Sequence, residues 1–168
     1  NVGLPFKGKQ ISQIIKEASL KITHPLPTTC THPNILIAGC GTGQHSIETA
    51  ARFENSNVVA IDLSFSSLAY AKRKTQELNQ NNIHYMQGDI LDLEILEQKF
   101  DIIESVGVLH HMENPIAGWR VLTNCLRSGG LMKIGLYSEL ARRSIVKARN
   151  EISNLGIEPN EKAMRKFR

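Results

Sequence analysis

Three glycines at alternate positions follow a short aliphatic run early in the chain. The run, residues 35–38, is typical of a strand buried on both faces, as in a parallel sheet. Gly39, Gly41 and Gly43 come directly after it, and residues 44–51 have the sequence of a helix. Glycines at such a point allow positive φ and let a ligand approach the bare backbone. The pattern therefore predicts a loop that binds a nucleotide cofactor.

The spacing of the glycines indicates which kind of cofactor the loop binds. A dinucleotide fingerprint, G-x-G-x-x-G or G-x-G-x-x-A, ends in a small residue that lets the helix pack under a pyrophosphate. That position is Gln44 when counted from Gly39, and Ser46 when counted from Gly41. We therefore expect the loop to curl around an amino-acid tail and a ribose instead of a diphosphate.

The run of residues 38–43 resembles the first motif of class I S-adenosylmethionine-dependent methyltransferases. That family commonly has an acid two residues before the first glycine, where this chain has Ile37. The family's acid helps to hold the methionine end of the cofactor. Its replacement leaves the methionine ammonium to backbone carbonyls around Ala38, Gly39 and Ser105, or to bridging water.

Two polar residues follow the glycine loop at the start of the expected helix. Gln44 and His45 stand where a helix N-terminus favours a carboxylate. They are candidates for binding the methionine carboxylate, and a role as solvated first-turn residues is the alternative.

An acid ends the second expected strand. Residues 58–62 form an aliphatic run that finishes at Asp62, 19 residues past Gly43. A carboxylate there can accept hydrogen bonds from both hydroxyls of a ribose, as a similar acid does in dinucleotide enzymes. Asp62 thus supports an adenosine ligand without deciding which one, and a plain strand-end residue is the alternative. Ser64 is expected to cap a helix over residues 65–78.

A second acid follows the third expected strand, at Asp89, and an apolar residue comes next, at Ile90. The methyltransferase family places such a pair beside the adenine. The resemblance implies that Asp89 accepts a hydrogen bond from the exocyclic amine and that Ile90 packs against the ring. A turn residue after Gly88 is the alternative for Asp89.

Two adjacent histidines follow the fourth expected strand, residues 100–106, in a segment that also resembles the family. The family's substrate pocket opens at this point. A histidine with a pKa near neutrality suits a general base for a hydroxyl or amine acceptor. His110 and His111 are therefore candidate catalytic residues, with local packing as the alternative. Adjacent histidines on a loop are expected to point apart, which disfavours a metal site with Glu113.

The segment after the histidines completes the expected domain. Asn114 and Pro115 predict the start of a helix. Its apolar residues at core spacing are Ile116, Trp119, Leu122 and Leu126. Residues 126–134 match the family's entry to a fifth strand, expected over residues 131–137, with Ser128 where proline is usual.

Five strands alternating with helices predict an α/β fold, a Rossmann-like doubly wound and mostly parallel sheet. The resemblance implies seven strands in a complete domain, so we expect this chain to lack the last two, an antiparallel hairpin. The chain begins at Asn1 and stops at Arg168 within a charged stretch, and we expect it to be a fragment. An exposed fifth-strand edge or C-terminal helix predicts self-association into a homo-oligomer.

The expected division of the chain places an amphipathic helix and a connector in residues 1–33, and the cofactor-binding domain in residues 34–168. The helix is indicated by apolar residues at helical spacing, and the connector by prolines. The apolar residues are Ile11, Ile14, Ile15, Ala18 and Ile22, and the prolines are Pro25, Pro27 and Pro33.

Composition is that of a globular domain, with 168 residues, 41% apolar and 21% charged. No apolar run reaches the length of a membrane span, so we expect a cytoplasmic protein without a membrane partner.

Cys30, Cys40 and Cys125 have no paired spacing, which indicates reduced thiols. The net charge of the chain is +4, and its basic excess lies after residue 132. No aromatic residues interleave with these charges, which favours a solvated helix face over a nucleic-acid surface.

The C-terminal region itself predicts one long helix. Tyr137 and Ser138 precede a pattern with an apolar stripe at helical spacing, made of Ala141, Ile145, Ala148 and Ile152. We expect this helix to begin at Ser138.

The function implied by the resemblance is transfer of a methyl group from S-adenosylmethionine to an acceptor, expected to be a small molecule. The alternatives are a non-catalytic S-adenosylmethionine-binding or interaction domain of a larger chain and, more weakly, an NAD(P)-dependent oxidoreductase. The sequence names no acceptor. The residues implied in cofactor binding are Ala38, Gly39, Cys40, Gly41, Thr42, Gly43, Gln44, Asp62, Leu63, Asp89, Ile90, Ser105 and Val106.

Overall fold

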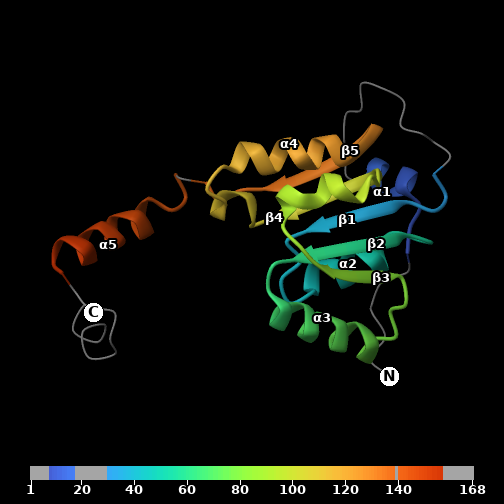
Figure 1. The fold of residues 1–168 in the computed structure, drawn as a ribbon, viewed down its shortest axis with the longest axis horizontal. Coiled ribbons are helices and arrows are strands. Elements are labelled where there is room, and N and C mark those ends of the chain that lie inside the picture. The colour runs from blue at the N-terminus through green and yellow to red at the C-terminus, as the bar shows by residue number, and fades with distance from the viewer. Residues whose placement is uncertain (1–7, 18–29, 139, 157–168) are drawn as a thin grey trace. The chain divides into compact units, whose positions relative to one another are not determined.

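Five strands in the described part of the chain form one parallel sheet. The computed structural model describes residues 8–17, 30–138 and 140–156 (Figure 1). The strand order is β3-β2-β1-β4-β5, with every neighbouring pair parallel. The strands are β1 (Asn34–Ala38), β2 (Asn57–Asp62), β3 (Ile83–Gln87), β4 (Phe100–Val106) and β5 (Leu126–Gly135). The predicted Rossmann-like fold class is therefore confirmed.

Helices cover both faces of this sheet (Figure 1). Helices α2 (Gln44–Arg52) and α3 (Phe65–Glu77) pack against β2 and β3 on one face. On the other face, α4 (Pro115–Cys125) packs with the 3-10 helices η1 (Ile90–Leu96) and η2 (Leu109–His111). Among residues 8–17, 30–138 and 140–156, no helix combines the length and the apolar character that crossing a bilayer requires.

Strand β1 is buried on both faces, as its aliphatic run predicts. Ile35 and Ile37 belong to the core under α2 and α3, while Leu36 and Ala38 belong to the core under α4 and η1. All four side chains are fully buried. Because side chains alternate across a strand, one short run supplies both cores.

Two helix starts that the sequence predicts, at Ser64 and Asn114, are present. The Ser64 hydroxyl accepts a hydrogen bond from the Ser67 N–H at the start of α3. The Asn114 side chain accepts one from the Ala117 N–H at the start of α4, with Pro115 at the first helical position. Each side chain satisfies an N–H group that has no partner within its helix.

The predicted core face of α4 is partly wrong. Ile116 and Trp119 are exposed, by 63% and 39%, whereas Leu122 is fully buried as expected. The buried face consists of Gly118, Leu122 and Cys125. A Cβ atom on Gly118 would lie 2.5 Å from the Met112 sulfur, so the close approach of the helix at this glycine sets its rotation.

The segments at the two ends differ from the prediction or are described only in part. In the N-terminal segment, α1 (Ile11–Glu17) packs Ile11 and Ile14 against the core under α2. Ala18, Ile22, Pro25 and Pro27 lie outside the described residues.

Contacts within the chain divide it after Leu136 into two units. In the second unit, α5 (Arg143–Asn154) begins five residues later than the predicted start at Ser138 and has no buried residue. The Ser138 hydroxyl instead accepts a hydrogen bond from Ala141 in the turn before α5.

The fifth strand also has different bounds from those predicted. β5 starts at Leu126 and ends at Gly135, since the glycine-containing entry already pairs with β4 through an irregular register. β5 lies at the edge of the sheet. Self-association through this edge stays a prediction.

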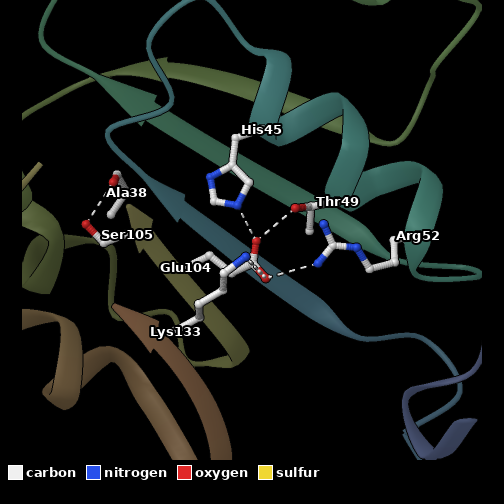
Figure 2. Close-up of polar contacts among 7 residues, drawn as sticks. All are labelled: Ala38, His45, Thr49, Arg52, Glu104, Ser105 and Lys133. Atoms are coloured by element: carbon white, nitrogen blue, oxygen red, sulfur yellow. Dashed lines mark hydrogen bonds and ion pairs between the residues drawn. The ribbon is translucent and has the colours of Figure 1, made fainter. Parts of the chain in front are cut away.

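A buried carboxylate joins the sheet to α2. The side chain of Glu104 on β4 is 4% exposed, and the α2 side chains of His45, Thr49 and Arg52 converge on it (Figure 2). The Thr49 hydroxyl donates a hydrogen bond of 2.9 Å to Oε2. Nε2 of His45 lies 2.6 Å from the same oxygen, a contact that becomes an ion pair when the imidazole is protonated. Nη1 of Arg52 lies 3.7 Å from Oε1.

The contacts of Glu104 keep its carboxylate charged. Burial raises the pKa of Glu104, but the contacts with His45 and Thr49 and the charge of Lys133 lower it by more. The pKa of Glu104 therefore lies below its usual value. A buried charge is tolerated only where such partners replace water.

The lowered pKa of Glu104 predicts a pH-dependent contribution to stability. The contribution is present above the pKa of the unfolded chain, about 4.3, and is lost as pH falls through the lower pKa of the folded protein. Glu104→Gln should therefore reduce the free energy of unfolding most near neutral pH, and the difference from the wild type should shrink below about pH 4. Urea unfolding at several pH values measures this difference.

The control is Glu48→Gln, which removes an exposed carboxylate from the same helix. This variant should show little pH-dependent difference. A stability loss in Glu104→Gln that stays the same from neutral to acid pH would contradict the assignment.

Candidate functional site

The glycine loop after β1 is held by the end of β2. The backbone N–H groups of Gly39 and Cys40 both donate to the carbonyl of Ile61, each at 2.9 Å. The N–H of Gly41 donates to Oδ2 of Asp62 at 2.7 Å. The loop conformation therefore depends on one carbonyl and one carboxylate of the neighbouring strand.

Two of the glycines show why this loop excludes side chains. Gly43 has a φ of 87°, and a Cβ atom there would lie 2.5 Å from the Cβ of Ala71 on α3. Gly41 has a φ of 52° and would direct a Cβ into open space. Gly43 therefore allows α2 and α3 to approach each other, and Gly41 leaves the backbone open to a ligand.

Two neighbouring cavities meet at the carboxyl ends of the strands. They share Gly39, Asp62, Gly107 and Val108 in their walls. The first cavity, of about 460 Å³, extends past the end of β3 and along η2. The second, of about 560 Å³, extends over the glycine loop to the first turn of α2 and to Lys133 on β5. We call them the first and second cavities below.

Most of the predicted cofactor residues lie in these walls. In the first cavity they are Gly39, Asp62, Leu63, Asp89 and Ile90. In the second they are Gly39, Cys40, Gly41, Thr42, Gln44, Asp62 and Val106. Ala38, Gly43 and Ser105 line neither cavity. The Ser105 hydroxyl donates to the Ala38 carbonyl at 3.1 Å, and both residues are fully buried, so this pair joins β4 to β1.

Asp62 and Asp89 offer carboxylate oxygens to the first cavity. Oδ1 of Asp62 accepts from the Ser64 N–H at 2.9 Å, and Oδ2 accepts from Gly41. Oδ1 of Asp89 accepts from the Leu91 N–H at 3.0 Å. An ionised carboxylate has about four acceptor positions, so each acid retains capacity for donors of a ligand.

The apolar wall of the first cavity differs in part from the prediction. Ile90 is only 6% exposed and belongs to the core, so it backs the cavity. Leu63 and Leu91 line it with exposed side chains, 67% and 48%. The sequence analysis did not single out Leu91, although it directly follows the predicted pair.

The second cavity has a helix N-terminus and a cation in its wall. α2 begins after Gly43 without a side-chain cap, so its first N–H groups have no side-chain acceptor. Nearby lie His45 and the exposed ammonium of Lys133. Cys40 supplies no nucleophile, because burial, followed by the charge of Asp62, raises the pKa of its thiol to about 12.

The two histidines face each other, contrary to the expectation that they point apart. Their Nε2 atoms lie 3.1 Å apart, and their ring centroids are 4.2 Å apart. The tight 3-10 turn of η2 brings the adjacent rings together. His111 lines the first cavity, with Met112 and Glu113, whereas His110 does not. The described part of the chain holds no group of three side chains suited to bind a metal ion.

Sequence analysis missed two charged residues beside the second cavity. Glu104 interrupts the apolar pattern of the β4 sequence, which was the available signal. Lys133 follows the glycines at the entry to β5, and nothing in its local sequence distinguishes it from a solvated lysine. Their significance depends on contacts between β4, β5 and α2.

Comparisons with known proteins agree with this geometry. A methyltransferase domain model matches residues 35–130. An uncharacterized protein of Synechococcus, syc1184_c, is 37% identical over 73% of this chain and 30% of its own length. The mitochondrial ubiquinone biosynthesis O-methyltransferase of Dictyostelium discoideum is 24% identical over 80% of this chain and 45% of its own. The chain thus spans less than half the length of these relatives.

A solved methyltransferase-like structure has the same fold and contains a bound adenosyl ligand. It is PKMT2 from Rickettsia typhi in complex with AdoHcy, 27% identical, with a TM-score of 0.57 over 64% of this chain and 21% of PKMT2. AdoHcy, S-adenosylhomocysteine, is the demethylated form of the cofactor. Since the family model covers more than half of the residues, the chain belongs to the methyltransferase domain family, whose cofactor is S-adenosylmethionine.

Proposed function

We propose that this chain binds S-adenosylmethionine across the two joined cavities and forms the cofactor-binding part of a methyltransferase. The observation that carries the proposal is the position of Asp62. Its carboxylate lies in the wall that both cavities share, between an apolar cavity and a cavity with a helix N-terminus. A ligand with a central ribose, an adenine on one side and an amino acid on the other matches this order of environments.

The cavity walls offer chemically suitable residues for each part of the cofactor. Asp62 would accept from the ribose hydroxyls, and the free oxygen of Asp89 would accept from the adenine amine. Leu63 and Leu91 would cover the adenine and exclude water. The uncapped N–H groups of α2 suit the carboxylate of the amino-acid end.

The cofactor supplies a methyl group on a sulfonium, which is already activated for transfer. The chain therefore has to align the acceptor and exclude water, and it needs few catalytic groups. For a hydroxyl acceptor a base within hydrogen-bond reach is useful. We propose His111 for this role because its ring lines the first cavity, with His110 as its neighbour at 3.1 Å.

The acceptor is proposed to be a small molecule. The relative from Dictyostelium discoideum, an O-methyltransferase of ubiquinone biosynthesis by name, supports this class.

The cofactor assignment predicts selective binding of S-adenosylhomocysteine. Calorimetric titration of the chain should show binding of this ligand and no comparable binding of NADH or NADPH. Asp62→Ala should weaken binding about ten- to a hundredfold, because the ribose would lose charge-assisted hydrogen bonds. Since Asp62 also holds the glycine loop, the thermal stability of the variant is measured in parallel.

The matched control is Asp92→Ala, which removes an exposed acid of η1 outside both cavities. It should bind S-adenosylhomocysteine like the wild type. Binding of NADH without binding of S-adenosylhomocysteine would overturn the proposed function. An unchanged affinity of a folded Asp62→Ala variant for S-adenosylhomocysteine would show that Asp62 does not bind the ribose.

The role of His111 is tested by turnover of the complete polypeptide with a panel of small hydroxyl acceptors. His111→Ala should lower the rate on the order of a hundredfold or more, the usual contribution of a general base. Its affinity for S-adenosylhomocysteine should change little. Full turnover by His111→Ala would exclude this histidine as the base, and cofactor binding without turnover of any acceptor would favour a non-catalytic domain.

A further inference from the structure

Glu104 occupies a position that links the core to the wall of the second cavity. In the parallel pairing of β1 and β4 it lies opposite Ile37, on the sheet face covered by α2. Its carboxylate is contacted from α2 by His45, Thr49 and Arg52, and from β5 by Lys133, whose Nζ lies 4.0 Å from Oε1 (Figure 2). Three elements thus meet at one buried anion.

Two of the partners of Glu104, His45 and Lys133, also line the second cavity, whereas Glu104 itself does not. Arg52 and Lys133 are cations at neutral pH, and His45 adds a third charge when protonated. Glu48 and Asp62 also line the second cavity, so its wall as a whole carries no positive excess. The features that favour an anion are local: the uncapped first turn of α2, which holds His45, and the Lys133 ammonium in the same wall.

A role confined to holding α2 on the sheet would not need Lys133. Its side chain is 55% exposed, and its ammonium stands between Glu104 and the open second cavity. A long lysine side chain in water adopts many rotamers, and an anion beneath it restricts them. Glu104 thus contacts both His45 and Lys133, the two basic side chains of the wall of the second cavity.

We propose that Glu104 is a positioning residue for the amino-acid end of the cofactor, holding His45 and Lys133 where they bind its carboxylate. This inference rests on the proposed function. Glu104 lies directly opposite Ile37, the β1 position where the family commonly has an acid. The two positions share one face of the sheet, so an acid on either strand lies beneath the first turns of α2.

The test compares two ligands that differ only at the amino-acid end. S-Adenosylhomocysteine has that end, and 5′-methylthioadenosine has the same adenosine and thioether without it. In calorimetric titrations, Glu104→Gln should weaken S-adenosylhomocysteine on the order of tenfold, equivalent to about 1.4 kcal/mol. Its affinity for 5′-methylthioadenosine should stay within about twofold of the wild type.

The matched control is Asp101→Asn. Asp101 is another buried acid of β4, paired with Arg127 at 2.8 Å and with the Asn34 N–H, and it lies outside both cavities. Its loss should not change the ratio of the two affinities. If Glu104→Gln does not fold, His45→Gln gives the same comparison at a site that is partly exposed, with the same selective loss expected.

The outcomes separate this inference from the proposed function. If the wild type binds neither ligand, the proposed function fails. If the wild type binds both, but Glu104→Gln or His45→Gln weakens both equally or neither, Glu104 has only a structural role and the inference is overturned. A selective loss of S-adenosylhomocysteine affinity, absent in Asp101→Asn, supports it.

Discussion

The glycine loop owes its shape to the end of β2, and the candidate site depends on that loop. The carbonyl of Ile61 accepts two consecutive loop N–H groups, and the carboxylate of Asp62 accepts a third. A loop rich in glycine is entropically costly to fix, so these three hydrogen bonds determine where the backbone faces the cavities. Asp62 therefore shapes the loop, and in the proposed function it also accepts hydrogen bonds from the ligand.

The parallel strand order brings the remaining groups to the same edge. With β1 in the middle of the order β3-β2-β1-β4-β5, the loops after β2 and β3 lie on one side of the glycine loop, and the loop after β4 and strand β5 lie on the other. Crevices at such a switch point are where open α/β sheets bind ligands. The first cavity lies at the ends of β2 and β3 and is also lined by the segment after β4, whereas the second lies over the glycine loop, next to α2, β4 and β5.

The sequence was sufficient wherever a feature depends on neighbouring residues. The strand at 35–38, the caps at Ser64 and Asn114 and the acids at strand ends all follow from local patterns. The prediction was wrong where the feature depends on packing. The exposed side of α4 follows from the contact between Gly118 and Met112, and the facing histidines follow from the tight turn of η2. Glu104 became interpretable only when its partners on α2 and β5 were known.

The proposed function requires the two cavities to be one cofactor site divided at Asp62. A crystal structure of the chain with S-adenosylhomocysteine would show whether they are. We expect the adenine between Leu63 and Leu91, the ribose at Asp62, and the amino-acid carboxylate at the first turn of α2, beside His45 and Lys133. A ligand bound outside these cavities, or one whose amino-acid end lies in the first cavity, would overturn this assignment.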